Sequence, residues 1–229
     1  MIKLSSIGAF SSGGNRLCFI DPSDDNRCIK LARPDRTPEK KRAAKAFPGN
    51  LRTLDYFDEN VCDMYVYEHI ETANGQSVYQ VVPRCYGYVE TSLGRGLSFE
   101  MIRDSDDKIS LTLQQYVWQF GWTDTLTKSI KQFQSLWQEL AMPSRNLLLH
   151  NILVQQIHHS DYSEIHRLVV IDGLGWPDII PLAYYIRPLA RFKAKRKSER
   201  LIGAVNQLIA KKQAGKESGT LGWLDEDKR

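Results

Sequence analysis

The sequence has few cysteines, and none of them forms a CxxC pair. Cys18, Cys28, Cys62 and Cys85 are the four cysteines among 229 residues, and they are scattered along the first part of the chain. Disulfide frameworks and structural zinc sites use closely spaced cysteines. We therefore expect reduced thiols and neither a disulfide scaffold nor a zinc centre.

Long apolar runs are also missing. No stretch approaches the roughly 18 uninterrupted apolar residues that a membrane-spanning helix requires. The first residues, MIKLSSIGAFSSGG, contain one lysine but no sustained apolar core and no small-residue cleavage site, so they do not resemble a secretion signal. We expect a cytoplasmic protein without a membrane partner.

The excess of positive charge is small. The chain holds 31 lysines and arginines against 27 acidic residues, which gives a net charge of +4. This balance is compatible with phosphate ligands but does not predict a nucleic-acid partner. A basic run occupies residues 187–200, and because it has few aromatic side chains to stack bases, a solvated helix face is favoured over a nucleic-acid groove.

The first part of the chain alternates apolar runs with turn residues. Residues 7–31 predict a hairpin that carries a Ser/Gly loop, and residues 51–70 have apolar positions at helical spacing. Two β-rich runs, at 78–91 and 96–104, predict a second hairpin. We therefore expect residues 1–103 to form a β-rich lobe with one helix.

The second part of the chain is more helical. Residues 123–141 carry an apolar stripe at spacings of three and four, which predicts a helix that packs in the core. Two short strands are expected at 151–157 and 167–173, and a basic helix at 182–212. We expect residues 104–214 to form a mainly helical lobe and the polar segment 215–229 to be mobile. The fold class is α+β.

Four features with a common chemistry occur in a meaningful order. They are a glycine turn at Gly13 and Gly14, a lysine in an apolar strand at Lys30, and two strand-end residues, Asn151 and Asp172. A glycine turn lets backbone N–H groups approach phosphates, a strand lysine supplies a fixed positive charge, and Asn and Asp oxygens can hold Mg²⁺. Together they predict a site for ATP and Mg²⁺.

This order resembles the protein-kinase signature set. Aligned on the kinase pattern HRDLxxxN, the segment SRNLLLHN places Asn151 on the metal-binding asparagine and Arg145 on the loop arginine. The same alignment places Asn146 where kinases have the catalytic aspartate and Ser144 where they have the histidine, so the catalytic base is missing. Asp172, in IDGLG, matches the aspartate of the kinase DFG motif, although this segment has one residue more.

The sequence does not decide which acidic residue pairs with Lys30. Asp63 aligns best with the glutamate that pairs with the strand lysine in kinases, whereas Glu59 lies four residues earlier on the same helix face. Either carboxylate could form the pair, and an aspartate would require a closer approach of the helix to the strand.

More narrowly, the chain resembles the YrbL family, whose members are described as part of the bacterial PhoP regulatory network and as related to kinases. The resemblance rests on RCIKL, DMYVYEHI, VPRCYGYVET, DxxDKISLTL, NIL and VIDGLG, and it covers roughly residues 10–200. It implies a protein-kinase-like bilobal fold with a shortened C-terminal lobe. Glu100 and Met101 are also expected to contact the nucleotide.

Three functions remain open. The first is a nucleotide-binding pseudokinase or very slow kinase, since an amide at Asn146 orients a hydroxyl but does not deprotonate it. The second is an active small-molecule or protein kinase whose base comes from Asp178 or from the substrate. The third is a regulatory adaptor that docks an unknown protein partner through the basic C-terminal helix.

Ordinary structural roles compete with these assignments. Lys30 could be an exposed strand residue, and Asn151 and Asp172 could be a strand cap and an Asx-turn. His150 is more easily explained by packing or solvent exposure than by phosphate binding. The histidines of the polar loop region are expected to be solvated at the surface; these are His158, His159 and His166.

Overall fold

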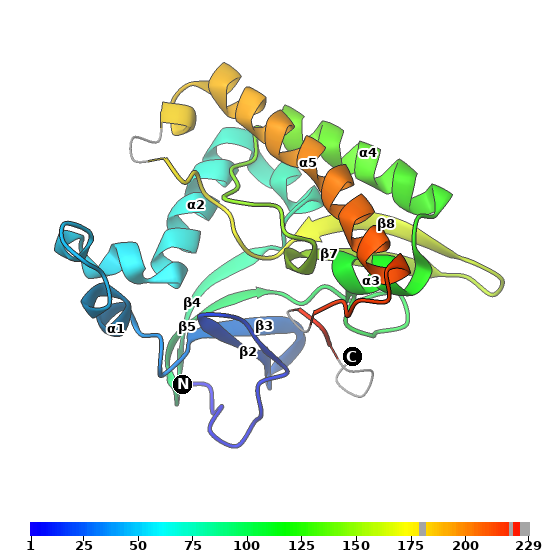
Figure 1. Cartoon of the computed structure of the whole chain (residues 1–229). Helices are drawn as coiled ribbons and strands as arrows, with labels where there is room; N and C mark the ends of the chain where they lie inside the picture. The colour runs from blue at the N-terminus through cyan, green and yellow to red at the C-terminus, as the bar shows by residue number, and fades with distance from the viewer. Residues whose placement is uncertain (179–181, 220–221, 225–229) are drawn as a thin grey trace. The chain divides into compact units, whose positions relative to one another are not determined.

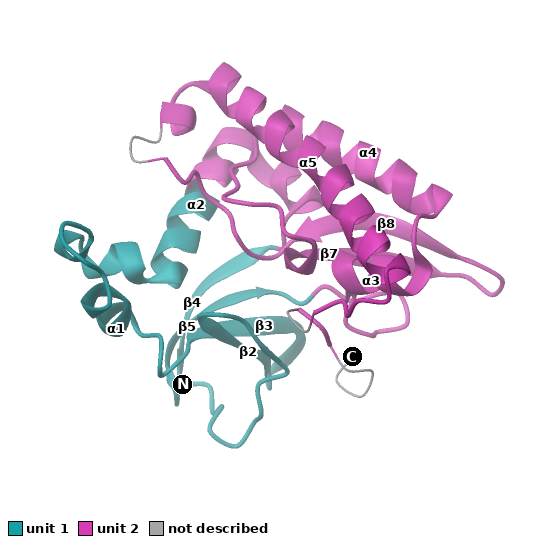
Figure 2. Cartoon of the chain, viewed as in Figure 1, with its two compact units in different colours: residues 1–68, 84–101 teal, residues 69–83, 102–229 magenta. Residues whose placement is uncertain are grey.

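The computed structural model describes residues 1–178, 182–219 and 222–224 (Figure 1). The chain folds into two compact units, which are residues 1–68 with 84–101 and residues 69–83 with 102–229 (Figure 2). The first unit contains a five-stranded sheet and the second contains the long helices of the C-terminal region, so the predicted α+β class is confirmed. The sequence predicted two contiguous lobes with a boundary after residue 103, and the second unit resumes close to this point, at residue 102. The units are not contiguous, however, because residues 69–83 belong to the second unit.

The sheet of the first unit consists of two hairpins. Its strand order is β1-β2-β3-β5-β4, and every neighbouring pair is antiparallel. The first hairpin joins β2 (Arg16–Asp21) to β3 (Asp24–Ala32), and the second joins β4 (Cys85–Thr91) to β5 (Gly94–Glu100). The short strand β1 (Ser11–Ser12) adds to the free edge of β2. Both predicted hairpins are therefore present.

A glycine allows β5 to pack closely against β3. A Cβ atom on Gly96 would lie 2.6 Å from Cγ2 of Ile29 and 3.1 Å from Cδ2 of Leu31, distances that no side chain tolerates without displacement. Ile29 and Leu31 belong to a buried apolar cluster with Leu4 and Phe19. The sheet core thus depends on a small residue in β5 opposite two branched residues in β3.

The second β-rich run was predicted to begin at residue 78, and that part of the prediction is wrong. Residues 78–80 lie in the 3₁₀ helix η3 (Gly75–Gln80), where Val78 and Tyr79 are buried, and strand pairing begins only at Cys85. A short apolar run suits a buried helical turn as well as a strand, and periodicity alone does not distinguish them.

The predicted helix at 51–70 begins later than expected. Helix α2 (Glu59–Asn74) follows the 3₁₀ turns η1 (Gly49–Leu51) and η2 (Leu54–Phe57). The Asp58 carboxylate accepts the Asn60 backbone N–H at 2.8 Å and so caps the first turn of α2. Before these turns, α1 (Pro38–Ala43) has no buried residue.

The second unit packs its helices beside a three-stranded antiparallel sheet, β6-β7-β8. The strands are β6 (Leu111–Thr112), β7 (Ile152–His158) and β8 (Ser163–Val170). Helix α3 (Leu113–Phe120) starts with a capping box in which the Thr112 and Gln115 side chains bond each other's backbone N–H groups. The predicted hairpin between the two C-terminal strands is present as β7–β8. Its second strand was predicted at 167–173, and that prediction is wrong at both ends because β8 runs from Ser163 to Val170.

The two longest helices of this unit pack against each other (Figure 1). Helix α4 (Asp124–Glu139) buries the predicted apolar stripe, namely Leu126, Ile130, Phe133 and Trp137. Helix α5 (Arg187–Gln213) is preceded by the 3₁₀ turn η5 (Leu182–Tyr184), and the Gln134 side chain on α4 donates to the Ser198 carbonyl on α5 at 2.9 Å. The apolar face of α4 therefore forms core, as its periodicity predicted.

Part of the segment after α5, which was expected to be mobile, contacts α3. The Gln115 amide donates to the Leu224 carbonyl at 2.8 Å, and the Gln114 amide donates to the Ser218 carbonyl at 3.1 Å. Leu224 is buried. Residues 220–221 and 225–229 of this segment lie outside the described residues. Within the part of the chain that is described, no helix combines the length and apolarity needed to cross a membrane.

Candidate nucleotide site

The glycine turn closes the hairpin between β1 and β2. The Gly13 N–H donates to the Arg16 carbonyl at 2.9 Å, so this amide is used inside the turn. A Cβ atom on Gly14 would meet nothing within 4 Å, and a Cβ atom on Gly13 would meet only the Arg16 carbonyl, at an ordinary 3.6 Å. The turn is therefore open at Gly14, whereas a phosphate contact at Gly13 would require the turn bond to break.

Lys30 lies in the central strand of the first sheet. It faces Cys18 on β2 and Leu97 on β5, and it is only 6% exposed, so the interpretation of Lys30 as an exposed strand residue is wrong. Its Nζ atom lies 4.5 Å from the centre of the Phe99 ring. Its carbonyl accepts the Asn60 side-chain amide at 3.1 Å, which fastens α2 to β3.

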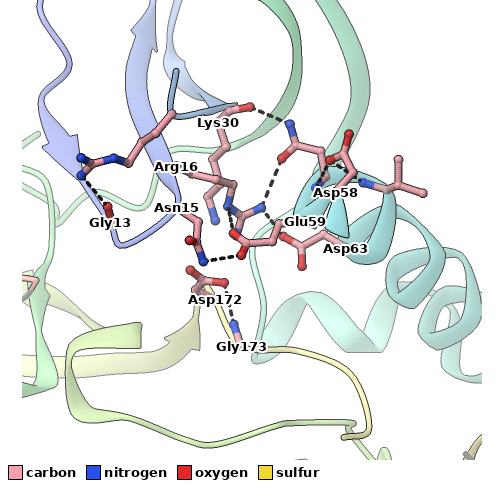
Figure 3. A network of polar contacts seen from close by, with 12 residues as sticks. Gly13, Asn15, Arg16, Lys30, Asp58, Glu59, Asp63, Asp172 and Gly173 are labelled. Atoms are coloured by element: carbon pink, nitrogen blue, oxygen red, sulfur yellow. Dashed lines mark hydrogen bonds and ion pairs between the residues drawn. The ribbon is translucent and has the colours of Figure 1, made fainter. Parts of the chain in front are cut away.

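Arg16 contacts both carboxylates that the sequence offered as partners for Lys30. Its Nη1 atom donates to Asp63 Oδ2 at 2.6 Å, and its Nε atom lies 3.6 Å from Glu59 Oε2 (Figure 3). The Asn15 amide also donates to Glu59, at 2.5 Å. Arg16 is 5% exposed, so this is a buried ion pair between β2 and α2.

Sequence reasoning missed Arg16, although a signal for it exists. Arg16 faces Ala32 across the hairpin and Cys18 faces Lys30. Because side chains two residues apart in a strand share a face, Arg16 and Lys30 are diagonal neighbours on one face of the sheet. The hairpin register alone would have placed a second cation beside Lys30.

Glu100 is the last residue of β5, and Met101 follows it. The Met101 N–H donates to the Asn26 carbonyl at 2.8 Å, and the Met101 side chain is buried. A Glu100 carboxylate oxygen accepts the Arg84 N–H at 3.0 Å, while the Glu100 N–H donates to the Arg84 carbonyl at 2.9 Å. These bonds fix the backbone where the first unit ends.

The second unit holds the other predicted site residues on two adjacent segments. The Arg145 N–H donates to the Gly173 carbonyl at 2.8 Å, and the Ile171 N–H donates to the Asn151 carbonyl at 2.9 Å. Ser144 and Leu174 also form an antiparallel bridge. The structure thus brings the 144–151 and 171–174 segments together, as a metal site shared by Asn151 and Asp172 would require.

Gly173 is needed for this close approach. Its φ of +79° lies in the left-handed region, and a Cβ atom on it would lie 3.2 Å from the Asn146 carbonyl oxygen and 3.6 Å from the Asn151 amide nitrogen. The Gly173 N–H donates to Asp172 Oδ1 at 2.7 Å, which orients that carboxylate. The oxygen donors that Asp172 and Asn151 offer suit Mg²⁺, which prefers hard ligands.

Asn146, at the base position, contacts a lysine from α5. Lys197 Nζ donates to Asn146 Oδ1 at 3.2 Å and also donates to the Arg145 carbonyl. Burial, followed by the nearby Arg200 and Arg196, lowers the pKa of Lys197. Sequence reasoning placed Lys197 on a solvated basic face. Its position between the buried Ala194 and Leu201, at helical spacing, is a signal that could have shown otherwise.

His150 lies in the short 3₁₀ turn η4 (Leu149–Asn151) that leads into β7. Burial lowers its pKa, and the nearby Asp172 carboxylate opposes this by raising it. A Cβ atom on Gly222 would lie 2.5 Å from the His150 Cβ, so the segment after α5 packs directly on this residue. The expected packing role of His150 is therefore present.

Comparison with known proteins supports the resemblance inferred from the motifs. The family model described as "PhoP regulatory network protein YrbL" matches residues 2–206. Two relatives, each named "Uncharacterized protein YrbL", come from Escherichia coli (strain K12) and Shigella flexneri. Each is 29% identical to this chain over 206 residues, which is 88% of this chain and 84% of the relative.

Proposed function

Because this chain belongs to the YrbL family, we propose that it is a kinase-like, nucleotide-binding regulatory protein of the PhoP network. In this proposal it is cytoplasmic, binds ATP with Mg²⁺, and transfers phosphoryl groups very slowly or not at all. The β-rich first unit and the helical second unit correspond to the two lobes of a kinase. Lys30, with the open turn at Gly14 and the backbone of Glu100 and Met101, contacts the nucleotide, and Asn151 and Asp172 hold Mg²⁺.

The contact between Lys197 and Asn146 carries this proposal. The Asn146 side-chain oxygen already accepts a hydrogen bond from an ammonium group at 3.2 Å. An amide oxygen has negligible basicity, and one that accepts from a cation is a still poorer proton acceptor. The loop therefore keeps polar groups for positioning a phosphate but lacks a base for the attacking hydroxyl.

The buried pair of Arg16 and Asp63 supports the nucleotide-binding half of the proposal. In kinases the strand lysine is held toward the phosphates by an acidic residue on the neighbouring helix. Here Arg16 joins β2 to α2 through Asp63, and Asn60 joins α2 to the Lys30 carbonyl. Helix α2 is thus fixed to the sheet that carries Lys30.

Thermal denaturation with and without Mg²⁺ and ATP tests nucleotide binding. A ligand present at one hundred times its Kd stabilises the folded state by about 2.7 kcal/mol, which is a rise of several degrees in Tm. We expect this rise in the wild-type protein and its loss in Lys30→Met and Asp172→Asn. The Asp172→Asn side chain keeps an oxygen for the Gly173 N–H while it removes the charge.

The matched control is Asp161→Asn, which removes a carboxylate from the exposed β7–β8 loop. It should show the full nucleotide-dependent rise in Tm. No rise in the wild-type protein, or an equal rise in all four proteins, would refute nucleotide binding at this site.

The exposed face of α5 favours a second candidate, which is an adaptor that docks an acidic protein partner. The helix buries one stripe, and the cationic side chains that it exposes include Arg191, Lys195, Arg196 and Arg200. Charge reversal at Arg196 and Arg200 should abolish capture of such a partner and leave nucleotide-dependent stabilisation intact. Capture that survives the reversal would exclude this candidate.

A further inference from the structure

Three metal-ligating groups converge at the far end of the β7–β8 hairpin in the second unit. His158 Nε2 lies 3.8 Å from Asp104 Oδ2 and 3.7 Å from Asp106 Oδ1. All three ligand atoms lie within 4.8 Å of one another. The sequence suggested only a solvated loop histidine here, because Asp104 and His158 are more than fifty residues apart and meet only through the fold.

The Asp104 carboxylate is buried and held in place by neighbours outside the cluster. Its Oδ1 atom accepts the Ser110 hydroxyl at 2.6 Å and the Gln156 backbone N–H at 2.9 Å. The residue is 4% exposed. With Oδ1 used in this way, the other oxygen, Oδ2, is directed toward His158.

His158 is oriented by neighbours in the same manner. Its Nδ1 atom and the Ser163 hydroxyl are 2.7 Å apart, and its backbone N–H donates to the Ser105 hydroxyl at 2.8 Å. When Nδ1 carries the proton and donates to Ser163, Nε2 presents its lone pair to the two carboxylates. Protein metal sites commonly fix a ligating histidine through its other ring nitrogen, as this arrangement does.

The spacing of the three atoms fits a shared cation better than direct hydrogen bonds. Nitrogen-to-oxygen hydrogen bonds measure about 2.7–3.2 Å, so 3.7 and 3.8 Å are too long for His158 to bond either carboxylate. Ligand atoms about 2.1 Å from a tetrahedrally coordinated ion lie about 3.4 Å apart. Small side-chain movements would therefore complete the coordination of an ion.

We propose that Asp104, Asp106 and His158 bind a divalent transition-metal ion of the Zn²⁺ type. One imidazole nitrogen and two carboxylate oxygens match the ligand preferences of Zn²⁺, whereas Mg²⁺ and Ca²⁺ prefer oxygen alone. The ion would link the 104–108 loop to the β7–β8 hairpin. Asn151 precedes β7 and His158 ends it, so the extended strand separates this site from the proposed Mg²⁺ site by about 20 Å.

Isothermal titration of the full chain with Zn²⁺ under reducing conditions tests the proposal. We expect one binding event that is lost in Asp106→Asn and in His158→Asn. Both side chains are about one-third exposed, so these variants should fold. An asparagine at 158 keeps a hydrogen-bonding atom near the position of Nδ1 and removes Nε2 with the outer part of the ring. Ser163→Ala should weaken binding by about 10- to 100-fold, as loss of an outer partner of a metal ligand does.

His159→Asn is the matched control, because His159 is adjacent to His158 but stacks on Tyr162 and faces Glu164 at 3.6 Å. This variant should bind Zn²⁺ as the wild-type protein does, and excess Mg²⁺ should not displace the Zn²⁺. Two results would overturn the proposal. One is no Zn²⁺ binding, which would leave the three side chains as neighbours that share no ion. The other is equal binding in His158→Asn, which would place the metal at other groups such as the thiols.

Discussion

At the scale of single residues, the proposed loss of phosphoryl transfer depends on Asn146, whose side-chain oxygen accepts a hydrogen bond from Lys197. An aspartate at position 146 would accept the same lysine and would also provide the missing base. We therefore expect Asn146→Asp to raise phosphoryl transfer from ATP by about 10²- to 10⁴-fold, the usual contribution of a positioned general base. Turnover of ATP by the purified variant measures this.

The control for this gain is Asn50→Asp, which creates the same charge at an exposed position outside the site. It should leave the rate unchanged. If Asn146→Asp also leaves it unchanged, some other part of the phosphoryl-transfer machinery is missing from the chain.

Cys28 gives the protein a distinct response to alkaline pH. Burial raises the pKa of its thiol from an ordinary 9.0 to about 12. Above pH 9 the unfolded chain releases the Cys28 proton while the folded chain retains it, so the unfolded state binds fewer protons and stability falls as pH rises. The slope reaches about 1.4 kcal/mol per pH unit up to pH 12.

Urea denaturation of the wild-type protein and Cys28→Ala across this pH window checks the prediction. The contribution of Cys28 is the difference between the two slopes, because other groups titrate in both proteins. Parallel slopes would show that the thiol ionises as readily in the folded state as in the unfolded one.

At the scale of elements, the Arg16–Asp63 pair joins α2 to the first sheet. Replacing one partner of a buried ion pair leaves the other charge without compensation and costs about 3–5 kcal/mol. We expect Arg16→Met to lower the free energy of unfolding by this amount. The double variant Arg16→Met with Asp63→Leu should lose less, because the buried Asp63 carboxylate is then not left without the arginine.

Urea midpoints of the two variants measure the effect, with Arg33→Met as the control. Arg33 pairs with Asp35 on the surface, where an ion pair contributes little, so its loss should change the midpoint only slightly. A double variant as unstable as the single one would mean that Arg16 stabilises the unit by packing alone.

Elements with a strong periodic pattern could be predicted from the sequence, and side-chain partners across elements could not. The apolar stripe of α4 and the turn residues of the hairpins each specify local structure, and all were predicted correctly. The prediction of a strand at residues 78–80 was wrong because a short apolar run does not distinguish a strand from a buried helical turn.

In the candidate site, too, the order of the motifs could be predicted from the sequence, whereas the side-chain contacts between elements could not. The order of Lys30, Asn151 and Asp172 along the chain suggested a shared chemistry, and the structure brings the segments of Asn151 and Asp172 together. Arg16 and Lys197 were missed because their contacts depend on strand register and on helix packing, which arise from the fold rather than from neighbouring residues.

At the scale of the molecule, the segment after α5 contributes to stability. Removing residues 218–229 leaves the buried Gln115 amide without its acceptor at Leu224, which costs about 1–3 kcal/mol. It also uncovers His150. Burial lowers the pKa of this histidine in the full chain, so the pKa should rise toward its ordinary value in the truncated chain. Urea denaturation and an NMR titration of His150 measure the two effects.

The matched control is Glu217→Gln, which changes an exposed side chain of the same segment and keeps residues 218–229 in place. It should match the wild-type chain in stability and in the titration of His150. An unchanged His150 pKa in the truncated chain would mean that this histidine is buried by the rest of the second unit.

Helix α2 contributes residues 59–68 to one compact unit and residues 69–74 to the other. Helix formation is cooperative, because each hydrogen bond depends on the ordered turn before it. Once residues 69–74 are helical, residues 59–68 can therefore extend the helix without a second nucleation step. Folding of the second unit would accordingly lower the entropy cost of forming residues 59–68 of α2, the segment that carries Glu59 and Asp63.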